Sequence, residues 1–268
     1  MRTRSLVRQV ATVTACLWLS ACAGQVRPHL SAAAPRSEAL LVLPGFGYGR
    51  HAEQALRELS TQMKDEGFDL YVPTYISRSG LGKSGERLQR FLREQRLDRY
   101  DRVHVFAFLA GGWTLNPLVE AQQLPNLATV IYDRSPLQER AARIATDDLH
   151  LLTWLRYGSP VFDFARTPYP PLDRPGVNVG LVVETRPTAF MRRHRGTARR
   201  YGPFAFDCDR FLQPHRDCAF FAMNHSDVYL RFAEVWPELR AFIRTGRFTS
   251  EANRAPPDGD PFTSVRNE

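Results

Sequence analysis

The sequence predicts an α/β protein with a mostly parallel central sheet and helices on both faces. Short continuous apolar runs recur along the chain, and most of them are followed by a longer segment whose apolar residues have helical spacing. Parallel strands need long crossover connections, so regular alternation of strands and helices is typical of a parallel sheet covered on both faces. A chain of 268 residues is long enough to bury the core of one such domain.

The continuous apolar runs predict six strands. They are 39–43, 68–72, 102–108, 127–132, 178–184 and 219–223. Segments with helical spacing predict helices, for example through Leu56, Leu59 and Met63 in the first of them. The predicted helices are 51–66, 83–97, 111–122, 138–156 and 226–244. In a sheet of this kind the functional site lies at the carboxyl ends of the strands.

Composition excludes several classes of protein. Apolar residues make up 43% of the chain and charged residues 24%, which are values of a globular protein and exclude global disorder. Only the first 21 residues contain an apolar run that approaches membrane length, so a multi-span membrane protein is also excluded. The formal charge is +8, and three of these charges lie in the N-terminal segment. Because the positive charge of the rest of the chain is modest, we expect no nucleic-acid partner.

The N-terminus has the pattern of an export signal. Arg2, Arg4 and Arg8 precede a short apolar run that ends in Leu-Ser-Ala-Cys at Cys22. This tetrapeptide resembles the lipobox of bacterial lipoproteins. The resemblance implies a signal peptide over 1–21, acylation of Cys22 with palmitate-like chains, and a lipid membrane as partner. Ala23 after the cysteine favours the outer membrane, facing the periplasm, within the bacterial envelope. An ordinary secretory signal or a short N-terminal anchor is the alternative.

The rest of the chain reads as one domain with two flexible ends. We expect a flexible tether over residues 22–37, the folded domain over 38–248 and a disordered tail over 249–268. Cys208 and Cys218 are the cysteines left in the domain, and an exported protein meets an oxidising compartment. We therefore expect a disulfide between them, with two buried free thiols as the alternative.

Three segments together resemble the α/β-hydrolase superfamily. Residues 43–47 (Leu-Pro-Gly-Phe-Gly) match its oxyanion loop, 103–112 match its strand, nucleophile elbow and helix start, and 223–227 match the loop of its catalytic histidine. The resemblance implies an α/β-hydrolase-like fold, oxyanion donors at Phe46 and Ala110, and His225 as the histidine of the triad. It leaves Asp133 and Glu184 as alternative candidates for the acid.

The nucleophile position departs from the superfamily. In the elbow pattern G-x-S-x-G, the serine is replaced by Leu109, which has no lone pair for attack and no proton to give. Loss of this serine from a working triad costs on the order of 10⁶ in kcat. Other serines near the expected sheet edge fit turn or helix-cap roles better than a nucleophile; they are Ser77, Ser79, Ser84 and Ser135. The triad candidates, His225 included, are therefore interpreted as remnants or structural residues.

An arginine-rich segment follows the fifth predicted strand. It is a candidate site for an anionic ligand, with a solvated basic loop as the alternative. The arginines are Arg186, Arg192, Arg193, Arg195, Arg199 and Arg200. No cysteine or histidine cluster has the spacing of metal ligands, so we expect no metal and no cofactor.

These observations leave three hypotheses for function. The first is an envelope lipoprotein of pseudoenzyme type, which binds a small apolar or acyl ligand at a site lined by Phe46, Leu109 and Trp113. The second is an active esterase or lipase that uses a displaced nucleophile with His225. The third is a structural or interaction lipoprotein. Whether the chain is an enzyme stays open at this point.

Overall fold

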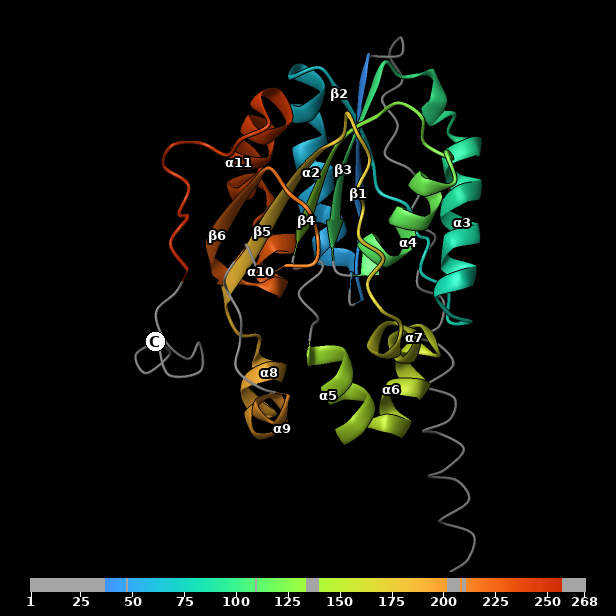
Figure 1. Ribbon diagram of the computed structural model, residues 1–268, viewed down its shortest axis with the longest axis vertical. Helices are drawn as coiled ribbons and strands as arrows, with labels where there is room; N and C mark the ends of the chain where they lie inside the picture. The colour runs from blue at the N-terminus through green and yellow to red at the C-terminus, as the bar shows by residue number, and fades with distance from the viewer. Residues whose placement is uncertain are drawn as a thin grey trace, which may run out of the picture.

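The computed structural model describes residues 37–46, 48–108, 110–133, 140–201, 208 and 211–256. The predicted signal peptide, Cys22, nearly all of the tether, Leu109 and Ser135 lie outside the described residues. A six-stranded sheet with the order β2-β1-β3-β4-β5-β6 forms the centre, and every neighbouring pair is parallel (Figure 1). The strands are β1 Glu38–Leu43, β2 Phe68–Tyr71, β3 Arg102–Phe108, β4 Leu127–Asp133, β5 Asn178–Arg186 and β6 Asp217–Asn224.

Helices cover both faces of this sheet (Figure 1). One face is covered by α2 Arg50–Asp65, α10 His225–Leu230 and α11 Phe232–Thr245, and the other by α3 Leu81–Glu94 and α4 Ala110–Glu120. A short 3₁₀ turn, η1 Leu97–Arg99, precedes β3. The fold class predicted from the sequence is confirmed, because the sheet is parallel and both of its faces are buried.

The strands are continuously apolar because each face has its own core. In β1, Leu40 and Val42 pack with the α2 and α11 side, whereas Leu41 and Leu43 pack with the α3 and α4 side. Successive side chains of a strand point to opposite faces, so a strand between two helical layers needs apolar residues at every position. This is the pattern that identified the strands in the sequence.

Five short helices form a cap beyond the carboxyl ends of the strands (Figure 1). They are α5 Arg140–Asp148, α6 His150–Tyr157, α7 Pro160–Arg166, α8 Ala189–Arg193 and α9 Arg195–Arg200. The single helix predicted over 138–156 is two helices, separated at Leu149, whose φ of −132° and ψ of 35° are not helical. The last predicted helix is likewise divided, at Arg231 with φ −112° and ψ 30°.

The end of the folded domain differs from the sequence-based boundary at Phe248. Residues 249–256 pack against β6 and α11: the Phe220 amide donates to the Asn253 carbonyl at 2.8 Å, and Arg254 pairs with Asp217 at 2.9 Å. The Thr249 amide donates to Glu238 at 2.9 Å. These contacts place 249–256 in the folded domain, whereas the rest of the predicted tail lies outside the described residues.

Cys208 and Cys218 form a disulfide, as the sequence predicts, with Cα atoms 6.4 Å apart. Cys218 lies in β6, so the bond fixes the segment that leads into this strand. Among the described residues, no helix has the length and apolar character needed to cross a membrane.

Candidate functional site

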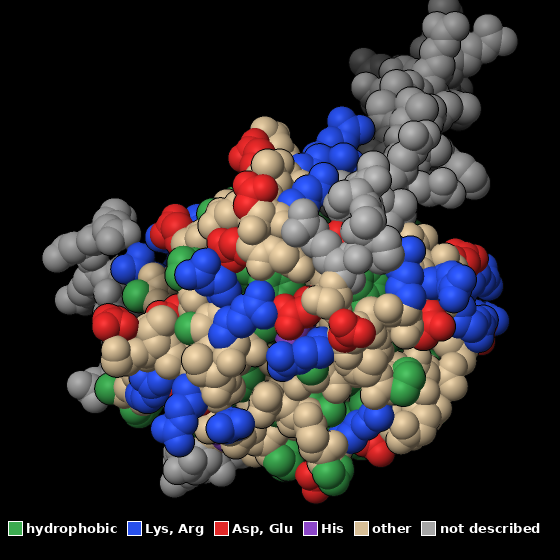
Figure 2. Space-filling view, turned by 90° about the horizontal axis from the view of Figure 1, so that it is seen from above, with side chains coloured by type: hydrophobic (Ala, Val, Ile, Leu, Met, Phe, Trp, Pro, Cys, Tyr) green, Lys and Arg blue, Asp and Glu red, His purple; other side chains and the backbone are tan. Residues whose placement is uncertain are grey.

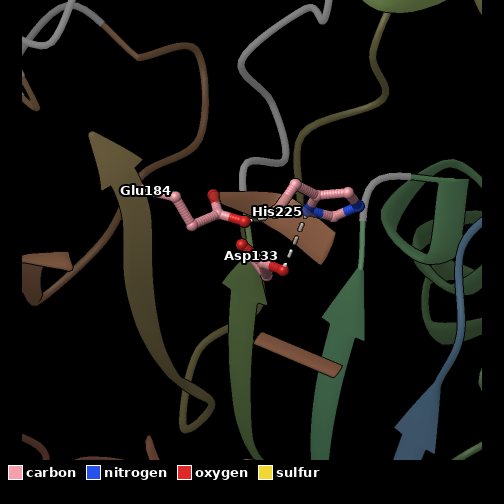
Figure 3. Close-up of side chains that lie close together, drawn as sticks. All are labelled: Asp133, Glu184 and His225. Atoms are coloured by element: carbon pink, nitrogen blue, oxygen red, sulfur yellow. Dashed lines mark hydrogen bonds and ion pairs between the residues drawn. The ribbon is translucent and has the colours of Figure 1, made fainter. Parts of the chain in front are cut away.

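Three side chains from separate segments meet at the carboxyl edge of the sheet (Figure 3). Asp133 is the last residue of β4, Glu184 lies near the end of β5, and His225 is the first residue of α10. Asp133 is opposite Val182 in the β4–β5 register, so Glu184 lies two residues further along the adjacent strand. The parallel sheet therefore brings together residues that are up to 92 positions apart in sequence.

The position of His225 is fixed by the start of its helix. Asn224 caps α10, accepting hydrogen bonds from the amides of Ser226 and Asp227 at 2.9 and 3.2 Å. The Asp227 carboxylate accepts in return from the Asn224 amide at 3.3 Å, which completes a capping box. Asp227 is thus an acid in the first turn of α10, which is favourable at a helix N-terminus, and the box orients the imidazole that precedes it.

Both candidate acids contact the same nitrogen of His225. Glu184 Oε1 lies 2.8 Å from His225 Nδ1, and Asp133 Oδ2 lies 3.4 Å from it. Asp133 and Glu184 are 0% and 1% exposed. The sequence offered these acids as alternatives, but the structure brings both to the histidine. The contacts therefore resemble the acid–histidine pair of a hydrolytic triad, with one carboxylate more than a triad has.

The two carboxylates change the protonation of the imidazole. Burial disfavours the imidazolium, but the negative charges of Asp133 and Glu184 outweigh this effect and raise the pKa of His225 to about 10. Burial, and then repulsion from Glu184, raise the pKa of Asp133 well above its usual range. At neutral pH the arrangement therefore favours a charged His225. An imidazolium can donate a hydrogen bond but cannot accept a proton as a general base.

The second ring nitrogen of His225 points away from both acids, toward the carboxyl end of β3 (Figure 3). The ring of Phe108, the last residue of β3, lies 5.7 Å from the imidazole, and so does that of Tyr229. Nε2 is buried, and it has no hydrogen-bond partner within the described part of the chain. Position 109 follows Phe108 directly, so Nε2 is directed to the neighbourhood where the superfamily places its nucleophile.

The same three atoms could in principle serve as cation ligands. One ligand atom each from Asp133, Glu184 and His225 lie within 4.8 Å of one another, a cluster that sequence spacing did not predict. However, Nδ1 and Oε1 already share a hydrogen bond of 2.8 Å. A proton between them accounts for this contact without a metal ion.

Two tyrosines hold the loop that corresponds to the oxyanion loop. The Gly45 amide donates to the Tyr229 hydroxyl at 2.6 Å, and the Tyr75 hydroxyl donates to the Pro44 carbonyl at 2.7 Å. Phe46 follows this pair, and Ala110 begins α4 at the same sheet edge. The two predicted oxyanion positions therefore both lie at the carboxyl edge of the sheet, Phe46 after β1 and Ala110 at the start of α4.

An aromatic cluster, here called the aromatic wall, lies between this edge and the cap. It consists of Phe46, Trp113, Tyr157, Phe164 and Tyr169. The ring of Phe164 lies 5.9 Å from that of Phe46 and 4.4 Å from that of Trp113, so α7 joins the two residues that the sequence assigned to a pocket. Helix α7 was not predicted from the sequence; its one signal is Pro160, because proline is favoured at the first position of a helix.

The alternative serine nucleophiles have structural roles where the structure describes them. Ser84 Oγ accepts from the Ser77 amide at 2.9 Å and donates to the Gly80 carbonyl at 2.8 Å. Ser77 Oγ accepts from the Ser79 amide at 3.2 Å. These bonds build the turn before α3, as the cap and turn interpretation predicts.

The arginine-rich segment is helical rather than a loop. It forms the end of β5 and the helices α8 and α9, and all six arginines are exposed. Asp148 of α5 pairs with Arg200 at 3.2 Å and with His194 at 3.1 Å, which ties α9 to α5. At least one of the six arginines therefore has a structural role.

Comparison of the whole structure with solved structures identifies the fold. A lipase from Bacillus licheniformis in its mature form is similar, with a TM-score of 0.55 at 14% identity, over 80% of this chain and 97% of the lipase. The type II thioesterase BorB from the borrelidin biosynthetic cluster has a TM-score of 0.50 at 14% identity, over 83% of this chain and 98% of that one. This chain has the α/β-hydrolase fold. Its sequence matches no protein-family model and no curated protein.

Proposed function

We propose that this α/β-hydrolase-like protein is an envelope lipoprotein that binds a small acyl ligand and does not hydrolyse it by the serine route. The proposal rests on the environment of His225 Nε2. This nitrogen is buried, has no hydrogen-bond partner among the described residues and belongs to an imidazole that two carboxylates keep protonated. A buried donor without an acceptor is costly, and a ligand oxygen would satisfy it.

The chemistry of the surroundings selects the ligand class. The carboxylates of Asp133 and Glu184 already neutralise the positive charge of His225, so the site favours a neutral acceptor such as an acyl carbonyl over a strong anion. The aromatic wall offers an apolar surface for the chain of the ligand. The sequence has leucine at position 109, where the serine route of hydrolysis needs a hydroxyl.

A specific observation also favours the second candidate, an active hydrolase with a displaced nucleophile. The 2.8 Å contact between His225 and Glu184 has the geometry of a working acid–histidine pair. Against it, the described residues place no serine, threonine or cysteine within hydrogen-bond distance of Nε2, and a protonated imidazole cannot activate one.

Two assays on the processed protein separate the candidates. Binding of the fluorescent fatty acid cis-parinaric acid is expected in the wild type, to weaken at least tenfold in His225→Ala and to stay unchanged in His51→Ala, which alters an exposed histidine on α2. Turnover of p-nitrophenyl butyrate is expected to be the same in the wild type and in His225→Ala. Wild-type turnover that His225→Ala abolishes would instead establish the hydrolase. Neither binding nor turnover would favour a structural lipoprotein.

A further inference from the structure

Helix α6 of the cap has its apolar side facing outward. Leu151, Leu152, Trp154 and Leu155 are 66%, 63%, 54% and 54% exposed. At about 100° per residue these four side chains cover an arc of roughly 160° around the helix. On the inward side, Thr153 is buried and its hydroxyl donates to the Ala145 carbonyl at 2.8 Å, and Tyr157 is half-buried in the aromatic wall.

This arrangement reverses the usual pattern of a surface helix, in which the apolar stripe faces the core. A contiguous apolar patch on a soluble domain marks a surface that meets another partner. Thr153, together with contacts of α6 to α5 and α7, holds the helix in place, so the outward leucines are not needed for its packing.

The surroundings of α6 are basic. The Arg78 guanidinium donates to the carbonyls of Leu155 and Arg156 at 2.8 and 2.6 Å, which fixes a positive charge at the carboxyl end of α6. Arg156 itself is exposed beside the apolar arc. The cap helices hold far more arginines than acids; the arginines are Arg140, Arg143, Arg156, Arg166, Arg192, Arg193, Arg195, Arg199 and Arg200, and the acids are Asp147, Asp148 and Asp163.

The opposite end of the molecule is different. Figure 2 shows the end at which the strands begin, where positive and negative side chains are interspersed. Glu38 there pairs with Arg244 at 2.5 Å and with Arg102 at 3.6 Å. An apolar helix that is flanked by Arg78 and Arg156, in a cap rich in arginine, thus distinguishes the cap end from this one.

We propose that the α6 surface, defined by Leu151, Leu152, Trp154 and Leu155, docks the cap onto an anionic phospholipid bilayer. Leucines can enter the boundary between headgroups and acyl chains, tryptophan favours this interface, and nearby arginines attract anionic headgroups. A phospholipid surface offers both the apolar layer and the negative charge that this surface complements. A second copy of the chain would bring its own arginines into the contact and is disfavoured by repulsion.

The tether is long enough for this orientation, a point that rests on the proposed lipid anchor. Strand β1 begins at the end opposite the cap (Figure 1). Strands of up to nine residues and one layer of helices add up to about 40 Å between the two ends. The chain between Cys22 and Ser37 can span at most about 50 Å when extended. Acyl chains on Cys22 and the α6 surface can therefore meet the same bilayer.

The test uses the protein from residue 23, which contains every described helix and strand and lacks the acylated cysteine. Docking by α6 is thus measured independently of the anchor and of acyl-ligand binding. We expect this protein to float with vesicles of phosphatidylethanolamine and phosphatidylglycerol (3:1), and much less with phosphatidylcholine vesicles. Trp154 reports the contact directly, because Trp113 and Trp236 are 8% and 1% exposed and should not change. Its emission should shift to the blue on vesicle binding, and Trp154→Phe should remove the shift.

The decisive variant replaces Leu151, Leu152 and Leu155 by serine. These side chains are exposed, so the fold should keep its thermal stability while vesicle affinity falls at least tenfold. The matched control replaces the exposed Leu212 and Leu230, which lie outside the cap helices, and should bind as the wild type does. Equal flotation of the triple variant and the wild type, or no flotation of either, would overturn the proposal. A dimer in light scattering that the triple variant abolishes would reassign the surface to self-association.

Discussion

Replacing Glu184 by Gln removes one of the two buried carboxylate charges at His225 Nδ1 and keeps the shape of the side chain. The pKa of His225 is raised to about 10 from an ordinary value near 6.5. At 1.36 kcal/mol per pH unit, this corresponds to about 5 kcal/mol of preference for the imidazolium. Glu184 lies closer to Nδ1 than Asp133 does, at 2.8 Å against 3.4 Å.

We therefore expect Glu184→Gln to remove about half of this preference, roughly 2 kcal/mol, and to move the titration of His225 toward neutral pH by more than one pH unit. The assay is NMR titration of the imidazole in ¹³C-histidine-labelled protein, with the signal assigned through His225→Gln. Glu234→Gln is the control, because Glu234 is exposed and pairs with Arg231 on α11. A wild-type His225 that titrates near pH 6.5, or a titration that Glu184→Gln leaves unchanged, would refute the reasoning.

Three further predictions concern stability. Because the pKa of His225 is raised in the folded state, its stabilisation is complete below about pH 6.5 and is lost as the pH rises toward 10. Urea unfolding should show a free energy that falls over this range by up to about 1.4 kcal/mol per pH unit, and His225→Gln should flatten the slope. Cys208→Ser opens a loop with a sequence separation of 10 and should cost about 2–3 kcal/mol, a loss that reduction of the wild type reproduces. A Cβ at Gly180 would meet the Phe242 ring at 2.8 Å, so Gly180→Ala should cost about 1–3 kcal/mol of stability and lower the melting temperature. Gly85→Ala, in open space on α3, should raise the melting temperature slightly.

The sequence was sufficient for the elements whose burial is set by the sheet. All six strands were predicted close to their observed bounds, because a strand buried on both faces is apolar at every position. The positions of Asp133, Glu184 and His225 at strand ends also followed from the order of the elements. That both acids reach one nitrogen did not follow, since it depends on the register of β4 with β5 and on the cap of α10.

The cap was the part that the sequence predicted least well. Its helices are short, between five and nine residues, and hydrophobic periodicity is weak over one or two turns. The break at Leu149 lies inside a segment that reads as a single helix, and α8 and α9 consist largely of arginine and small residues. In α6 the apolar residues face outward, so periodicity correctly indicated a helix there but could not indicate which side is buried.

The central claim is that this α/β-hydrolase-like site binds without a serine nucleophile. Labelling of the processed wild-type protein with a fluorophosphonate, followed by mass spectrometry of the intact protein and of its peptides, tests the claim most directly. A serine activated by His225 would react and carry the added mass. We predict no adduct at neutral pH. An adduct on a single serine that disappears in His225→Ala would contradict the claim and identify the displaced nucleophile of an active hydrolase.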